Sequence, residues 1–198
     1  MRRKTFDALL TTGGLIMAAV LIVAGALLTW AHTFVHHEVR SQLAQQQIYM
    51  PKSGSPEIAS PQVAPYLSKY AGQQLLTGAQ AKAYADHYIN VHLQKIGGGL
   101  TYSQLSAKSL ADPTNTQLAG QVQTVFRGET LRGLLLNAYA FDTMGNIAGI
   151  AAIASFAGAG MMLVMSGLGA WHLRRTSPED EVLPELTRHA TPSPAMSV

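Results

Sequence analysis

Three histidines early in the chain have the residue type and spacing that could bind a metal ion. His32 and His36 are four residues apart, so they would share one face of a helix, and His37 follows directly. Two histidines at this spacing supply two ligands, whereas a complete site needs three or four. Further ligands could come only from distant segments, through Asp142, His87 or His92. The alternative is that the three early histidines are interfacial residues just outside a lipid layer.

Charged residues in the second half of the chain could form ion pairs or an anion pocket. Glu129 and Arg132 are three residues apart and lie on or near the apolar stripe of a predicted helix. Because an unpaired buried charge is costly, we expect these two side chains to form a structural ion pair. The alternative is a pocket for an anion or a lipid headgroup that is built on Arg127 and Arg132. We also expect Arg40 and Asp142 to pair, because both should stand at one height above a membrane.

The composition excludes several classes of chemistry. The 198 residues include no cysteine, which excludes a disulfide scaffold, a zinc–thiolate site, an iron–sulfur cluster and a cysteine nucleophile. The sequence contains no GxSxG motif, P-loop, dinucleotide fingerprint or HExxH motif. The net charge of +3 is small and comes from clusters beside the apolar segments, so nucleic acid is not an expected partner. These absences favour a protein that is not an enzyme and that has no cofactor.

Two apolar stretches, residues 8–31 and 146–173, contain no Asp, Glu, Lys or Arg. Each is long enough to cross a bilayer as a helix, which takes roughly 20 apolar residues. The first stretch is longer than the apolar region of a usual signal peptide, so we favour an uncleaved anchor over cleavage near residues 24–26. Since neither stretch carries a charge, a proton relay or ion path within the lipid is excluded.

Basic residues stand beside both apolar stretches, at the ends nearest the termini. Arg2, Arg3 and Lys4 precede the first stretch, and Arg174 and Arg175 follow the second. Short basic flanks remain in the cytoplasm, which predicts a multi-pass protein of the cell membrane with both termini cytoplasmic. The predicted layout is a cytoplasmic N-terminus (1–7), a transmembrane helix (8–31), an extracytoplasmic helical domain (32–145), a second transmembrane helix (146–173) and a disordered cytoplasmic tail (174–198).

Local signals predict where the helices of the middle region begin and end. No glycine or proline occurs between residues 26 and 50, which predicts one long helix from about residue 7 to 48. Capping boxes are predicted at residues 77–80 and 101–104, and the three glycines at 97–99 should stop the first of these helices. The last helix should begin at residues 112–113 and merge with the second apolar stretch.

The resulting fold class is all-α, with two long antiparallel transmembrane helices extending into an extracytoplasmic helical bundle that contains two or three short helices. Small residues recur at helical spacing within or beside both spans and would let helix backbones approach closely. They are Gly14, Ala18, Gly145, Gly149, Ala154 and Gly158. These positions could pack the two spans of one chain together, or they could dock the chain onto another membrane protein or a second copy.

Four segments resemble an uncharacterised family of actinobacterial two-span membrane proteins. They are YAGQQL at 70–75, TGAQAKAYADH at 77–87, LAGQVQ at 118–123 and FRGETLRGLLLNAYAF at 126–141. The resemblance covers most of the chain up to about residue 175 and implies a two-span membrane protein. Members are sometimes labelled aromatic ring-opening dioxygenases, but the family has no established activity, so the resemblance assigns no functional residue.

The sequence leaves three hypotheses for function. The favoured one is a non-enzymatic integral membrane protein whose outer helical domain binds or scaffolds another cell-envelope component, as an accessory subunit of a larger complex. Its expected partners are the lipid bilayer and another membrane or envelope protein, or a second copy of itself. The second hypothesis is an extracytoplasmic sensor of a small molecule or lipid. The third is a metal- or haem-binding enzyme that depends on the histidines.

Overall fold

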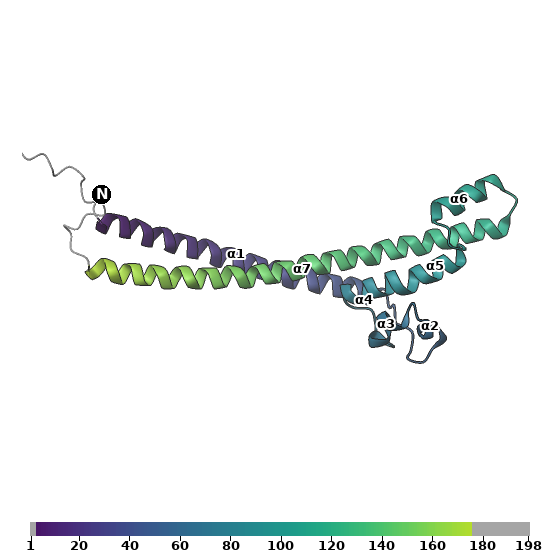
Figure 1. Ribbon diagram of the computed structural model, residues 1–198, viewed down its shortest axis with the longest axis horizontal. Helices are drawn as coiled ribbons and strands as arrows, with labels where there is room; N and C mark the ends of the chain where they lie inside the picture. Colours follow the sequence, from purple (N-terminus) through teal and green to yellow (C-terminus); the bar gives the residue numbers. More distant parts are fainter. Residues whose placement is uncertain (1–2, 176–198) are drawn as a thin grey trace, which may run out of the picture. The chain divides into compact units, whose positions relative to one another are not determined.

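The computed structural model describes residues 3–175, with side chains from residue 5 onward, and nearly all of this range is helical (Figure 1). The elements are α1 (Arg3–Gln45), α2 (Pro56–Ala59), α3 (Ala64–Leu67), η1 (Ser68–Tyr70), α4 (Gly78–Ala83), η2 (Tyr84–Ile89), α5 (Asn90–Ile96), α6 (Tyr102–Ala111) and α7 (Thr116–Arg175). The described residues form no β-strand, and one isolated bridge pairs Tyr49 with Gln74. The predicted all-α class is therefore confirmed.

The chain divides into two compact units, and α1 and α7 contribute to both. The described part of unit 1 contains residues 3–27 and 152–175, and unit 2 contains residues 28–151. The predicted tail lies outside the described residues from 176 onward, whereas residues 174 and 175 complete α7.

Unit 1 consists of the N-terminal part of α1 and the C-terminal part of α7. Both helices are long and apolar enough to cross a membrane. The residues that are most buried where they touch are small: Ala18 is fully buried, and Ala159 and Ser166 are nearly so. Most of the large apolar side chains point away from this contact, and Leu10 and Ile16 are 68% and 61% exposed. The helices therefore cover little of each other's apolar surface.

The ends of the two long helices differ slightly from the predicted ones. α1 ends at Gln45 rather than near residue 48, because Gln47 takes the left-handed conformation with φ of 53°. α7 begins at Thr116 rather than at residues 112–113. Asp112 instead accepts hydrogen bonds within a turn, and the Asn115 side chain then accepts the backbone N–H of Leu118. Asn115 is thus the N-terminal cap that the sequence reading missed.

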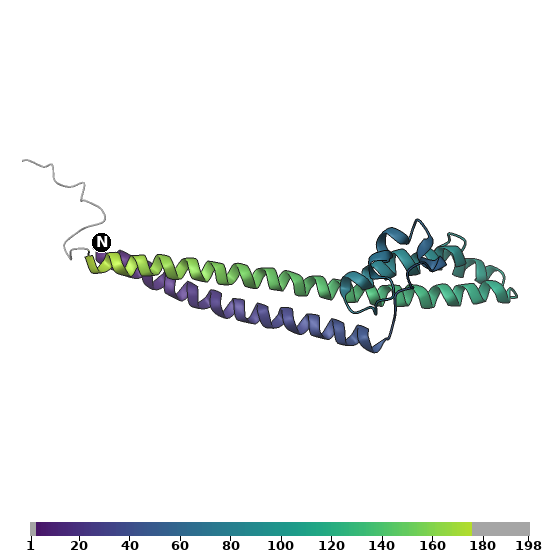
Figure 2. The ribbon, with the colours of Figure 1, turned by 90° about the horizontal axis from the view of Figure 1, so that it is seen from below.

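Unit 2 is organised around a core in which α1, α7 and the short helices meet. Figure 2 shows α2 to α5 gathered beside the teal part of α7, and the core cluster joins their side chains. The members at most 2% exposed are Leu43, Met50, Val63, Leu67, Leu75, Ala81, Ala85 and Leu135. Each large aliphatic side chain buried in this way stabilises the fold by about 1.5–3 kcal/mol. This core ties the proline-rich segment after α1 to the long helix α7.

The predicted helix at residues 77–96 forms as α4, η2 and α5 in direct succession. Its capping box is complete: the Thr77 hydroxyl accepts from the Gln80 backbone N–H, and the Gln80 side chain accepts from the Thr77 N–H. The glycine stop is confirmed as well, because Gly98 and Gly99 have φ of 60° and 80° and the Gly99 N–H bonds to the Gln94 carbonyl. The sequence did not predict that residues 84–89 are π-helical.

The remaining short helices of unit 2 are α6 and those of the proline-rich segment. The second capping box, Thr101 with Gln104, starts α6 as predicted. The proline-rich segment contains more helix than expected, since α2, α3 and η1 all form there, and α2 and α3 each have a proline in the first turn. The short helices of unit 2 therefore exceed the two or three that were expected.

Candidate functional site

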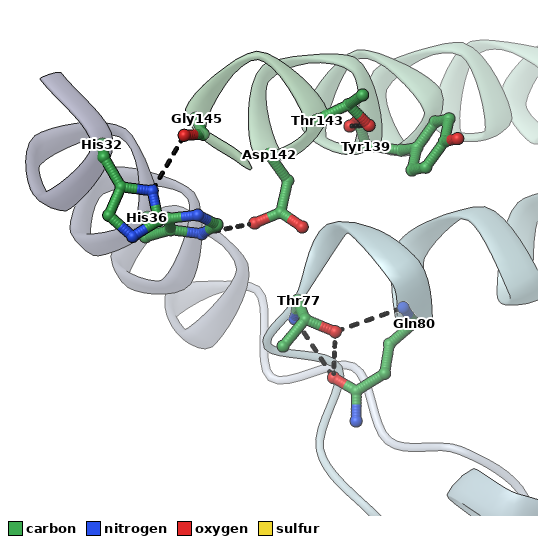
Figure 3. A network of polar contacts seen from close by, with 8 residues as sticks. All are labelled: His32, His36, Thr77, Gln80, Tyr139, Asp142, Thr143 and Gly145. Atoms are coloured by element: carbon green, nitrogen blue, oxygen red, sulfur yellow. Dashed lines mark hydrogen bonds and ion pairs between the residues drawn. The ribbon is translucent and has the colours of Figure 1, made fainter. Parts of the chain in front are cut away.

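The polar contact between α1 and α7 in unit 2 is made by two histidines (Figure 3). Nδ1 of His36 lies 2.9 Å from Oδ1 of Asp142, and Nδ1 of His32 lies 2.8 Å from the Gly145 carbonyl oxygen. Because a carbonyl oxygen can only accept, Nδ1 of His32 carries a proton and donates it, and the same role suits His36 toward a carboxylate. The two hydrogen bonds fix the orientation of both rings against α7.

Asp142 occupies a crowded position between α1 and the beginning of α4. Its side chain is only 15% exposed, and a Cβ placed on Gly78 would collide with it. The capping box of Thr77 and Gln80 stands beside it (Figure 3). Only a residue without a side chain can begin α4 this close to α7.

The expected partner of Asp142 was Arg40, and the structure corrects this pairing. Arg40 is exposed and forms no ion pair with any residue that the structure describes, whereas His36 bonds to Asp142. The reason is the position of the two residues along the axis of α1 relative to Asp142 on α7. Gly145 lies opposite Val35 and His36, so Arg40 stands about one helical turn beyond the position that faces Asp142.

The histidines do not converge on a shared site within residues 5–175. His37 is exposed, His87 stacks on Tyr66 with ring centroids 3.4 Å apart, and Nδ1 of His92 bonds to the Tyr88 carbonyl. No group of three or more His, Asp or Glu side chains in the described range is placed to hold a metal ion. His32 and His36 therefore serve as contacts between helices in this structure.

A second polar cluster joins η2 to α7 in unit 2. Nη1 of Arg132 lies 3.2 Å from Oε2 of Glu129, which is the pair expected from the sequence, and Nη2 lies 3.4 Å from Oδ1 of Asp86. Asp86 also accepts a hydrogen bond of 2.6 Å from Lys82. The i,i+4 spacing of Lys82 and Asp86 was a signal that the sequence reading did not use. The link to Arg132 spans 46 positions and has no local signal.

The electrostatics of this cluster favour its charged forms. Burial alone would raise the pKa of Asp86, but the hydrogen bond from Lys82 and the charges of Lys82 and Arg132 outweigh it, so the pKa lies below its ordinary value. The hydrogen bond to Asp86 raises the pKa of Lys82. Next to the cluster, burial together with the neighbouring Tyr88 raises the pKa of Tyr84 to about 12. Both partners of the Lys82–Asp86 pair are therefore ionised at neutral pH.

The structure separates the two arginines that were expected to build an anion pocket. Arg127 is exposed, while the guanidinium of Arg132 is shared between two carboxylates. Residues five apart on a helix point in different directions, so the two positive charges do not converge. The positive charge of Arg132 is therefore neutralised inside the protein.

Most of the small residues singled out from the sequence line the contact between α1 and α7. In unit 1, a Cβ on Gly14 would meet Ser166, one on Gly158 would come within 3.4 Å of Leu21, and Ala18 is buried. In unit 2, Gly145 and Gly149 face α1 in the same way, toward Val35 and His32.

Ala154 is the exception among these small residues, because it is exposed. The buried small residues of α7 recur every seven positions instead. They are Gly145, Ala152, Ala159 and Ser166. A repeat of seven keeps one side of a helix facing a partner helix. Gly149 lies four residues after Gly145 and shares its face, whereas Ala154 lies five residues after Gly149 and is turned away from that face.

No family model, no curated protein and no solved structure matches this chain.

The lowered pKa of Asp86 predicts an acid-sensitive contribution to stability. A depressed carboxyl pKa stabilises the fold fully above the unfolded value of 3.8, and this contribution is lost as the pH falls through the lower folded value. In chemical unfolding of the full chain in detergent, we expect Asp86→Asn to lower the free energy of unfolding by about 1 kcal/mol at pH 7. The difference from the wild type should shrink below about pH 4.

A companion variant identifies the cause of this effect. Lys82→Met removes the hydrogen bond that contributes most to lowering the pKa, so part of the same acid dependence should disappear. A difference between the wild type and Asp86→Asn that stays constant from pH 7 to about pH 3 would show that the carboxylate is not stabilised by these charges.

Proposed function

We propose that this chain is an integral membrane protein with two antiparallel spans, residues 8–31 and 146–173, and an extracytoplasmic helical domain that binds or scaffolds another envelope component. The observation that carries the proposal is the uncovered apolar surface of α1 and α7 in unit 1. The side chains of Leu9, Val23 and Val164 are 61%, 59% and 64% exposed. Such a surface is stable only in lipid or against another protein.

The antiparallel arrangement is supported by the contacts between α1 and α7 within each unit. In unit 1, Thr11 faces Gly169 and Gly14 faces Ser166. In unit 2, His32 faces Gly149, and Val35 faces Gly145. Within each unit the residue numbers rise along α1 as they fall along α7, which is the pattern that two oppositely directed helices produce.

The orientation is supported by the distribution of basic residues. The sequence places Arg2, Arg3 and Lys4 before the first span and Arg174 and Arg175 after the second. Positive residues close to short flanking segments are retained in the cytoplasm. Both termini are therefore cytoplasmic in this proposal, and residues 32–145 lie outside.

A binding role is supported by apolar side chains that unit 2 leaves exposed. Leu110 on α6 is 79% exposed, and Phe126 and Leu134 on α7 are 48% and 57% exposed. The rings of Tyr102 and Phe126 lie 5.5 Å apart and together form an exposed aromatic pair. Exposed aromatic and aliphatic side chains of this kind are typical of protein-binding surfaces. The partner in this proposal is another membrane or envelope protein, or a second copy of the chain.

Cysteine labelling tests the orientation, because the natural chain contains no cysteine. Ala107→Cys places an exposed thiol on α6, and Ser193→Cys places one near the C-terminus. In intact cells, a membrane-impermeant maleimide should label the first variant and should label the second only after permeabilisation. The unsubstituted chain is the blank. The reverse pattern would invert the topology, and equal labelling of both sites without permeabilisation would contradict a two-span protein.

The particle mass in native lipid tests the binding role. When the protein is extracted from its own membranes into nanodiscs, the protein mass per particle should exceed that of one chain. Phe126→Glu should shift it toward the single chain, because a buried charge at an apolar contact is costly. Gln123→Glu adds the same charge at an exposed polar position of α7 and should leave the mass unchanged. A wild-type particle that always contains one chain alone would contradict the proposal.

A further inference from the structure

Unit 2 contains a cavity of about 430 Å³ at the junction of α5, the glycine turn, α6 and α7. The side chains of Leu93, Leu100 and Val125 give it an apolar floor, and Asn90, Gln94 and Ser103 are among the polar residues of its wall. Cavities of this size hold small ligands in other proteins. Three local features create the space: the end of α5, the left-handed glycines after it, and the capping box that starts α6.

The polar side chains of the wall are available for a ligand. Within the described residues, no hydrogen bond joins the side chains of Asn90, Gln94 or Ser103 to other protein groups. Gln94 and Ser103 are exposed and Asn90 is half-buried, so a ligand would replace water at these groups. A carboxamide offers both donors and acceptors, and a hydroxyl does the same. A second cavity of about 390 Å³ shares Asn90 and Gln94 and adds Gln62, which extends the amide-lined surface, together with Val91 and the exposed Lys95.

The charges at the cavity do not favour an ion. Glu129 and Arg132 both line it, but they bond to each other, and Arg132 also reaches Asp86. The two positive charges of the cluster, on Arg132 and Lys82, are thus balanced by the two carboxylates of Glu129 and Asp86. A ligand that matches this wall is neutral and carries several groups that both donate and accept hydrogen bonds.

We propose that this cavity binds a neutral carbohydrate of one or two sugar units. A sugar ring has hydroxyl groups around its edge, which suit carboxamides and hydroxyls, and it has an apolar face. The apolar floor can contact that face, and the ring of Tyr102, also at the cavity, offers a flat surface of the same kind. The inference goes beyond the proposed function, which concerns a protein partner. Tyr102 borders both surfaces, whereas Asn90, Gln94 and Ser103 belong to the cavity alone.

Saturation-transfer NMR on the full chain in nanodiscs tests the inference with three probes: glucose, maltose and N-acetylglucosamine. At roughly millimolar concentration, we expect saturation transfer to at least one of them. Gln94→Ala should weaken its binding about tenfold, which corresponds to the loss of about 1.4 kcal/mol. Gln94 is exposed, so the variant should fold. Gln123→Ala, at an exposed position of α7 that does not line either of these cavities, is the matched control and should bind like the wild type.

The outcomes separate a sugar site from other possibilities. Inorganic phosphate should neither bind nor displace the sugar, and binding of phosphate without any sugar would replace the proposal by an anion site. The proposed sugar site would be overturned if no saturation were transferred to any of the three sugars. It would also be overturned if Gln94→Ala and Gln123→Ala weakened sugar binding equally. None of these results affects cysteine labelling or particle mass, so the proposed membrane function stands or falls separately.

Discussion

Two helices that are apolar over most of their surface can approach closely only where their side chains are small. This constraint governs the contact between α1 and α7. In unit 1 the buried side chains of the contact are small, at Ala18, Ala159 and Ser166. The larger side chains that enter it, Leu21 and Phe156, lie against glycines, at Gly158 and Gly25. A hydrophobic driving force between helices is absent in lipid, so close packing of small residues must supply the attraction. In the membrane setting that we propose, acyl chains solvate the exposed apolar side chains on the remaining surface.

In unit 2 the same pair of helices uses polar contacts as well. The hydrogen bonds from His36 to Asp142 and from His32 to the Gly145 carbonyl connect the two helices directly. Asp142 also lies against Gly78, so one position on α7 fixes both α1 and the start of α4. Further along α7, Arg132 is bonded to Asp86 in η2. The short helices are therefore attached to α7 by charged and polar contacts in addition to the shared core.

The sequence predicted the features of the fold that depend on neighbouring residues. Thr77 with Gln80 and Thr101 with Gln104 are local capping signals, and the glycines at 97–99 are a local stop. Two of the features it missed, the Asn115 cap and the Lys82–Asp86 pair, are also local. The others depend on residues far apart. The predicted partner of Asp142, Arg40, lies about one helical turn beyond the observed partner, His36. The local sequence of either helix does not determine how the two helices are aligned along each other. Asp86 lies in the π-helical segment η2, and its link to Arg132 spans 46 positions, so no short motif predicts this link.

The central claim is the specific packing of α1 on α7 in unit 1, and a disulfide tests it most directly. A Cβ on Gly14 would lie 3.6 Å from that of Ser166, within the range of about 3.5–4.5 Å that disulfides require. In isolated membranes, Gly14→Cys with Ser166→Cys should oxidise rapidly to a bond within one chain. Gly13→Cys with Ser166→Cys is the control, because a Cβ on Gly13 would meet nothing within 4 Å. Equal oxidation of both pairs, or bonds only between chains, would contradict the account.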